Sequence, residues 1–182
     1  MPKRLTQIST GFGDKGSTVL GDGRKVRKSN VRIAAIGDID ELNCLLGILL
    51  GKLTGDDLNT LVLDIQHTLF DIGGELSLPG KCLIEARYTH YLNKLIKKYN
   101  DELEALDDFI LPGGSEPAAL CQLARAVCRR AERSLVAVME EEEINPETLI
   151  FINRLSDLLF IIARILLLRG GETELLWEKG RL

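Results

Sequence analysis

The sequence predicts an all-α protein, an up-and-down bundle of four or five helices that carries an irregular N-terminal arm. Three observations lead to this fold class. Apolar residues recur every three or four positions in each long segment after residue 30. No segment alternates apolar and polar residues as a half-buried strand does. The last long segment, residues 149–168, is apolar on nearly all sides and must therefore lie inside a bundle.

Size and composition fit a single domain over residues 1–182. The net charge of −4 argues against general nucleic-acid binding, because that function needs a basic surface. The first residues lack the apolar stretch of a signal peptide. The longest apolar run, Leu158–Leu168, is interrupted by Arg164 and is too short to span a bilayer. We therefore expect a cytoplasmic protein with neither a nucleic-acid nor a membrane partner.

Residues 1–30 form the expected arm, which contains the sequence TGFGDKGST at residues 10–18. Its glycines would let backbone amides approach a phosphate closely, and Lys15 would add a cation. Two of the glycines are spaced as in a P-loop, but Ser17 stands at the lysine position and no hydrophobic strand precedes it, which excludes a P-loop fold. A second loop, residues 21–28, adds four cations. These residues alone leave a nucleotide loop and a flexible tail equally open.

Three helices are expected in the first part of the bundle, at residues 31–53, 56–72 and 84–106. The first of them carries Asp38, Asp40 and Glu41 in its N-terminal half, where the helix dipole favours negative charge. These carboxylates either form a solvated face or pair with arginines of a later helix.

A fourth helix is expected after a Pro-Gly-Gly turn, with Ser115 as its N-cap and with frayed residues at the acidic run 140–143. Along it, Arg125, Arg129 and Arg133 recur at every fourth position and share one face. The simplest interpretation of such a stripe, which requires no ligand, is a solvated basic face. The alternative is an anion site, which arginine suits better than lysine because its planar group binds phosphate or carboxylate through two hydrogen bonds.

The fifth helix is expected to begin at Pro146 with Asn145 as its cap. Although it is otherwise apolar, Asn153, Asp157 and Arg164 fall within roughly 40° of one another around its axis. A polar line on a buried helix is costly unless every member finds a partner. The line is either a structural network within the core or a surface that meets an interface or a ligand.

The cysteines suggest neither a disulfide nor a metal site. Cys121 and Cys128 share one helix face about 10 Å apart, too far for a disulfide, so buried free thiols are expected. The two histidines do not stand near a cysteine in a ligand pattern. We therefore expect no metal held by protein side chains.

Five motifs in order resemble the PduO-type ATP:cob(I)alamin adenosyltransferases, also called corrinoid adenosyltransferases. The motifs are TGFGDKGST, IGDIDELN, FILPGGSEPAA, LARAVCRRAER and INRLSDLLFIIAR. Together they cover almost the whole chain, from residue 10 to about residue 169. The sequence RRAER followed some twenty residues later by NRLSD is highly specific to this family.

The resemblance implies a ferritin-like helical bundle that assembles as a homotrimer, with active sites between subunits. ATP would be bound by the glycine loop of one subunit and the arginine helix of the next, with Mg²⁺ held through the ATP phosphates. By this resemblance the ATP-binding residues are Thr10, Gly11, Phe12, Gly13, Asp14, Lys15, Gly16, Thr18, Lys28, Arg129, Arg130, Glu132, Arg133 and Asn153.

The resemblance also implies roles in catalysis. Asp40 is expected to pair with Arg125 across the subunit interface, and Phe109 to crowd the lower face of the corrin ring. Arg129 would act on the triphosphate. This chain departs from the family pattern at Ile36, where many relatives have tyrosine. The difference could alter the preference among corrinoids.

The implied reaction transfers the 5′-deoxyadenosyl group of ATP to the cobalt of cob(I)alamin and releases triphosphate. Because Co(I) is itself a strong nucleophile, the protein needs no serine, cysteine or histidine in that role. A reductase or an adenosylcobalamin-dependent enzyme is a further possible partner.

Two other functional classes remain open. One is a non-catalytic ATP or corrinoid sensor built on the same bundle, which formation of adenosylcobalamin would distinguish from an enzyme. The other is a helical interaction domain whose arginine stripe docks an acidic partner, although such a domain has no need of the glycine loop.

Overall fold

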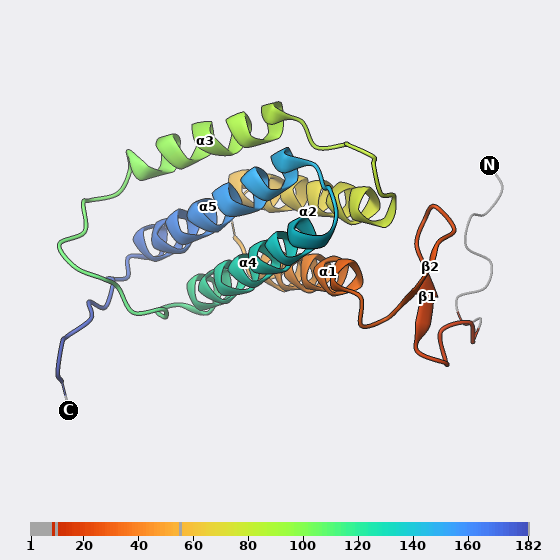
Figure 1. Cartoon of the computed structure of the whole chain (residues 1–182). Coiled ribbons are helices and arrows are strands. Elements are labelled where there is room, and N and C mark those ends of the chain that lie inside the picture. Colours follow the sequence, from red (N-terminus) through yellow and green to blue (C-terminus); the bar gives the residue numbers. More distant parts are fainter. Residues whose placement is uncertain (1–8, 10, 55, 182) are drawn as a thin grey trace.

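The computed structural model describes residues 9, 11–54 and 56–181, and within this part the chain forms an all-α bundle, as predicted. Successive helices alternate in direction along the bundle (Figure 1). The helices are α1 (Val31–Leu50), α2 (Asp56–Ser77), α3 (Ala86–Asn100), α4 (Glu116–Glu141) and α5 (Pro146–Gly170). None of the helices in the described part is long and apolar enough to cross a membrane.

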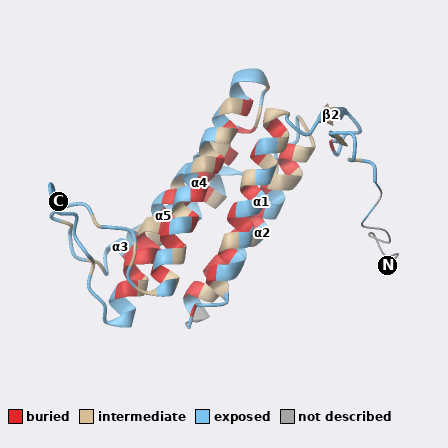
Figure 2. Ribbon diagram, turned by 90° about the horizontal axis from the view of Figure 1, so that it is seen from below, coloured by how far each residue is buried: buried red, intermediate tan, exposed pale blue. Residues whose placement is uncertain are grey.

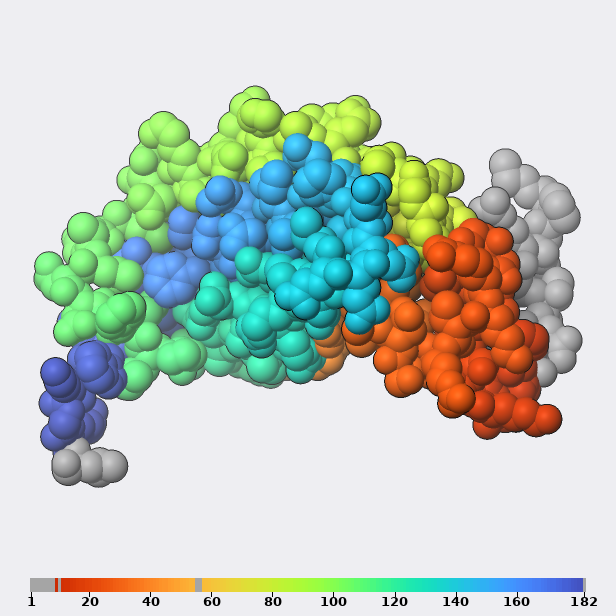
Figure 3. Space-filling view, in the orientation of Figure 1, coloured from red at the N-terminus to blue at the C-terminus, as the bar shows by residue number. Residues whose placement is uncertain are grey.

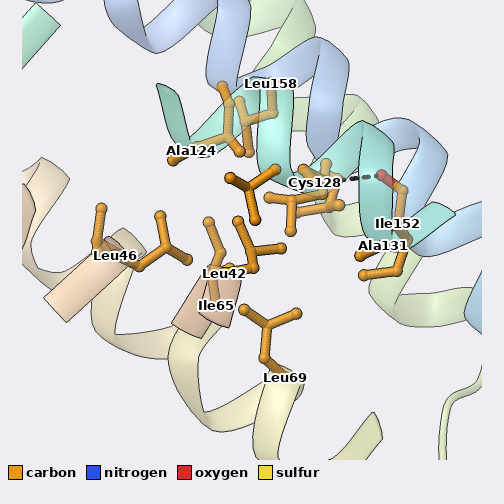
Figure 4. Close-up of a cluster of buried hydrophobic side chains, with 14 of the residues drawn as sticks. Leu42, Leu46, Ile65, Leu69, Ala124, Cys128, Ala131, Ile152 and Leu158 are labelled. Atoms are coloured by element: carbon orange, nitrogen blue, oxygen red, sulfur yellow. Dashed lines mark hydrogen bonds between the residues drawn. The ribbon is translucent and has the colours of Figure 1, made fainter. Parts of the chain in front are cut away.

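The core lies between the helices in one continuous cluster that draws side chains from all five of them. Helix α4 packs against both α1 and α5, α2 covers α1, and α3 covers α5. The buried residues accordingly follow the inward faces of the helices (Figure 2). In the middle of the cluster, Leu42 of α1, Ile65 of α2 and Leu158 of α5 surround Ala124 and Cys128 of α4 (Figure 4). Helix α5 is buried on most sides, as its all-round apolar sequence predicts.

Helix α2 is longer than predicted. The sequence predicts an end near Ile72, because the next two residues, Gly73 and Gly74, disfavour a helix. The helix instead continues to Ser77. The additional turn buries Leu76, which is 1% exposed, and burial of that side chain opposes the glycine penalty of about 1 kcal/mol per residue.

Helix α3 is shorter than predicted at both ends, since it begins at Ala86 and ends at Asn100. At its start, the amides of Leu83 and Ile84 donate to Glu75 Oε2, at 2.5 and 3.0 Å. Glu75 also accepts hydrogen bonds from Asn145 Nδ2, at 3.0 Å, and from the Thr148 hydroxyl. This buried carboxylate therefore connects the end of α2 to the segment before α3 and to the start of α5.

The remaining helix ends are partly as predicted. Asn145 caps α5, since Glu147 N donates to its Oδ1 at 3.1 Å. Ser115 occupies the N-cap position of α4, but its hydroxyl makes no capping hydrogen bond. The expected fraying at residues 140–143 is not seen, because α4 runs to Glu141 and the next residue, Glu142, accepts from buried Arg32 at 2.9 Å. Helix α1 ends at Leu50, three residues earlier than the predicted limit at 53.

The arm contains a short hairpin, which corrects the prediction that the chain has no strands. Strands β1 (Ser17–Val19) and β2 (Lys25–Arg27) pair antiparallel. Strands of three residues are too short for a period of two to be recognised in the sequence. The hairpin projects beyond one end of the bundle (Figure 1), and Gly21 N donates to Ser77 O of α2 at 2.7 Å.

Candidate functional site

The glycine loop and Lys28 come together at the base of the hairpin. Lys28 N donates to Gly16 O at 3.0 Å, which closes the loop onto the end of β2. A Cβ atom on Gly13 would lie 2.7 Å from Lys28 Nζ, so the ammonium group lies directly against the backbone of the glycine loop. The structure thus holds a cation against the glycine loop, where we expect phosphate to bind. Thr10, the first residue of the motif, lies outside the described residues.

The rest of the loop faces outward and can meet a ligand. Phe12, Asp14 and Lys15 are exposed, whereas Thr18 is half-buried on β1. Gly11 and Gly16 have φ angles of 66° and 74°, which L-residues with a side chain rarely adopt. Their positive φ angles form successive tight turns, with Gly16 N donating to Gly13 O at 3.1 Å.

The predicted arginine stripe lies on the middle of α4. Arg129 and Arg133 are exposed, and Arg133 Nη1 donates to Arg129 O at 2.8 Å. Arg125 is half-buried and donates to Gln122 Oε1 at 2.7 Å. Among the residues described, no carboxylate forms a salt bridge with any of these arginines. Their positive charges are therefore available to an anion from outside the protomer.

Arg130 behaves differently from the three arginines of the stripe. Its guanidinium forms salt bridges with Asp38, at 3.1 Å, and with Glu41, both on α1. The Ser134 hydroxyl donates to the other Asp38 oxygen at 2.5 Å. The expected pairing between α1 carboxylates and a later arginine is thus confirmed for Arg130. The specific pairing of Asp40 with Arg125 across an interface stays a prediction, and Asp40 is exposed in the protomer.

Glu132 and Asn153 join α4 to α5 beside the stripe. Asn153 Nδ2 donates to Glu132 Oε1 at 2.8 Å, and both residues lie in the predicted ATP set. Asn153 and Asp157 are exposed, but Arg164, the third member of the predicted polar line, is buried. The line therefore divides into a surface part next to the arginines and a structural part in the core.

Phe109 lies far from the glycine loop of its own chain. Its side chain is 77% exposed. It belongs to the segment between α3 and α4, which lies at the opposite end of the bundle from the hairpin (Figures 1 and 3). Helix α4, with 26 residues, spans most of that separation, roughly 39 Å at 1.5 Å per residue. A single protomer therefore does not bring the glycine loop and Phe109 into one site.

Comparison with known proteins identifies the family. The sequence model described as cobalamin adenosyltransferase matches residues 8–166. The chain belongs to this family. A cobalamin adenosyltransferase from Cupriavidus metallidurans is 48% identical over 100% of this chain and 99% of its own length. The corrinoid adenosyltransferase of Bacillus subtilis is 40% identical over 96% of this chain and 93% of its own.

Solved structures of PduO-type adenosyltransferases share the fold of this family member. A phenylalanine-to-alanine variant from Lactobacillus reuteri, complexed with cobalamin and ATP, has a TM-score of 0.90 and 36% identity, and the match covers 95% of this chain and 100% of that one. An arginine-to-lysine variant from the same organism, complexed with ATP, has a TM-score of 0.89, 37% identity and coverage of 94% and 100%.

Two parts of this adenosyltransferase-family chain were not found by sequence reasoning. One is the choice of Arg130 as the partner of Asp38 and Glu41, because the sequence indicated only that these carboxylates could pair with an arginine of the later helix. The other is the pairing of the C-terminal residues 175–177 with the Phe109 segment, which no local pattern indicates. In the part of the chain that the structure describes, no group of three or more histidine, cysteine or acidic side chains is placed to hold a metal.

The cysteines of α4 are free and buried, as predicted, whereas Cys44 and Cys82 are free and exposed. Cys121 Sγ donates to Leu159 O at 3.2 Å, and Cys128 Sγ to Ile152 O at 3.3 Å. Burial raises the pKa of Cys121 to about 12, and burial also raises the pKa of Cys128. Both side chains therefore remain neutral thiols near physiological pH and are poor nucleophiles.

Thiol titration tests this placement. At pH 8 a group with a pKa near 12 is ionised in only about one molecule in ten thousand. We expect a chromogenic disulfide reagent to label Cys44 and Cys82 rapidly in the native protein, and all four thiols after denaturation. A Cys44→Ser, Cys82→Ser double variant should lose the rapid phase. Rapid labelling of a third thiol in the native protein would contradict burial of the α4 cysteines.

Proposed function

We propose that this chain is an ATP:corrinoid adenosyltransferase that forms adenosylcobalamin from ATP and a reduced corrinoid. The observation that carries the proposal is the likeness, over almost the whole chain, to enzymes of this name, including a structure complexed with cobalamin and ATP. We further propose that the chain works as a single domain in the cytoplasm, where ATP is available.

The reaction needs charge stabilisation more than a protein nucleophile. The electron pair of Co(I) attacks C5′ of ATP, a Co–C bond forms, and the C5′–O bond breaks with its electrons leaving on the triphosphate. The leaving group gathers negative charge in the transition state, so cations already in place lower the barrier. Lys15 and Lys28 of the arm, with Arg129 and Arg133 of α4, are the cations proposed for this role.

The glycine loop supports a specific part of this mechanism. Most residues of the range 11–16 are exposed, so a phosphate can approach the backbone of the loop closely, and the ammonium of Lys28 lies against the same loop. Mg²⁺, when bound through the phosphates, would add further neutralisation of their charge. The glycine loop and Lys28 would therefore hold the polyphosphate tail, which leaves the adenosine end free to reach the corrinoid.

Two protomers would combine to make each site, in the proposed homotrimer. The glycine loop lies beyond one end of its own bundle, whereas the arginine stripe lies on the middle of α4 (Figure 1). The charges of Arg125, Arg129 and Arg133 have no carboxylate partner among the described residues of their own protomer, and Asp40 is exposed. An arm from a neighbouring subunit, and the carboxylate of its Asp40, would complement these charges.

Phe109 is proposed to meet the corrinoid. Its side chain is 77% exposed, so its ring can contact a large apolar surface such as the face of a corrin ring. Pressed against the lower face of the corrin ring, it would exclude a lower axial ligand and favour four-coordinate Co(II), which is easier to reduce to Co(I).

The proposed function is tested by incubating the protein with ATP, Mg²⁺ and chemically reduced cobalamin. We expect adenosylcobalamin, followed by its absorption spectrum, and triphosphate in equal amounts. Binding of ATP and cobalamin without either product would identify a sensor and refute the enzyme. Release of phosphate or diphosphate in place of triphosphate would refute the proposed bond cleavage.

The arginines of α4 should separate into two roles. Arg129→Ala or Arg133→Ala should lower kcat/KM for ATP about 10- to 100-fold, the effect of losing a charge-assisted phosphate contact of about 1.5–3 kcal/mol. Their melting temperatures should stay near that of the wild type. Arg130→Ala should instead lower the melting temperature slightly, because it removes salt bridges to α1 that are partly exposed. Arg87→Ala, on the surface of α3, is the control for loss of an exposed arginine. Near-wild-type kinetics for both stripe variants would remove them from the site.

The proposed contact between Asp40 and Arg125 predicts a charge-swap rescue. Asp40→Arg and Arg125→Asp should each weaken the trimer and the activity, because each single change brings like charges together. The double variant should recover part of both, as measured by sedimentation velocity and by turnover. Additive losses in the double variant would show that the two side chains do not meet.

A further inference from the structure

The segment that carries Phe109 is held by the C-terminal residues of the chain. Leu111 N donates to Leu175 O at 2.8 Å, and Trp177 N donates to Phe109 O at 2.7 Å. Between these bonds, Ile110 and Leu176 form an antiparallel bridge. We call residues 171–181, which follow α5, the C-terminal tail. So short a pairing is only marginally stable by itself in water, so another interaction must dock the tail.

Arg164 provides that interaction. It is 6% exposed on the otherwise apolar α5. Its Nε donates to Glu174 Oε1 at 2.5 Å, and its Nη2 donates to Glu174 Oε2 at 3.2 Å and to Glu104 O at 2.8 Å. The guanidinium thus binds the tail through both carboxylate oxygens and the segment before Phe109 through a carbonyl. A buried arginine left without its carboxylate would be strongly unfavourable, which ties docking of the tail to the core.

Phe109 depends on these contacts because its own side chain packs against little of the protomer. With 77% of the residue exposed, its orientation is set by its backbone. One backbone contact is local, from Phe109 N to Asp108 Oδ1 at 2.7 Å. The contact from outside its own segment is the hydrogen bond that its carbonyl accepts from Trp177, three residues after Glu174.

We propose that Arg164 and Glu174 are positioning residues for the transfer reaction: their ion pair docks the C-terminal tail, and the tail fixes Phe109 toward the corrinoid. The proposal rests on the proposed function for the role of Phe109. Neither residue needs to touch a substrate, since Arg164 is buried and Glu174 is occupied by it. When the ion pair is broken, the tail should release the backbone of Phe109 while the helical bundle and the ATP-binding face stay intact.

The single tryptophan of the chain makes tail docking measurable without activity. Trp177 is the only tryptophan and is 44% exposed in the docked tail. Glu174→Lys places a second cation against Arg164 and should release the tail. We expect a red-shifted emission and an acrylamide quenching constant higher by about twofold, as the indole becomes fully solvated. Glu178→Lys makes the same charge change in the same tail and should leave both signals unchanged, because the ion pair of Glu178 among the described residues is with exposed Arg181, at 3.8 Å.

Kinetics then test whether docking serves the reaction. Glu174→Lys should lower kcat by at least about tenfold in an assay that starts from Co(II) corrinoid and a chemical reductant, with KM for ATP within about twofold of the wild-type value. In a Phe109→Ala background the same change should cause no further loss, because the residue that it positions is already absent. Helix content, followed by circular dichroism, should remain near wild type at the assay temperature, whereas the melting temperature should fall because buried Arg164 loses its carboxylate partner.

Three results would overturn the proposal. They are unchanged tryptophan signals in Glu174→Lys, equal effects of Glu174→Lys and Glu178→Lys, and losses in turnover that add to those of Phe109→Ala. A wild-type protein that forms no adenosylcobalamin would instead refute the proposed function. The fluorescence comparison would then decide the docking of the tail separately.

Discussion

Burial of α5 is the constraint on which the rest of the structure depends. A helix that is apolar on nearly every side is stable only when neighbours cover it, and here α4 and α3 pack directly against it. Polar groups on such a helix are tolerated only at its uncovered positions or with a partner. Asn153 and Asp157 take the first solution and Arg164 takes the second. The same packing thus produces a polar surface beside the arginine stripe and an anchor for the C-terminal tail.

Because α4 packs between α1 and α5, its arginines lie in different environments. Arg130 faces α1, where Asp38 and Glu41 neutralise it, so its charge serves the contact between two helices. Arg129 and Arg133 point away from those carboxylates and keep their charge for the surface. Consecutive residues on a helix differ by about 100° in direction, so Arg129 and Arg130 point to different surroundings although they are neighbours in the sequence.

The positions of the glycine loop and Phe109 at opposite ends of the bundle make assembly central to the proposed chemistry. One chain carries, beyond one end of its bundle, the arm that we propose binds phosphate, and it carries an exposed aromatic residue, Phe109, at the other end. Subunit contacts would bring such parts together. They would also bury charge and apolar surface that the protomer leaves open, which gives the same residues a part in both stability and catalysis.

The sequence by itself determined the helical class, the order of the five helices, the free cysteines and, through its motifs, the family. These features depend on residues that are neighbours in the sequence or that recur at fixed spacings along it, so they can be recognised without the tertiary structure. The sequence could not determine where α2 ends or where α3 begins, because burial of Leu76 and the hydrogen bonds of Glu75 outweigh local propensity. Nor could it pair Arg130 with α1 or Arg164 with Glu174. Those partners are chosen by which helix faces meet and where the chain returns after α5, and only the packed tertiary structure decides that.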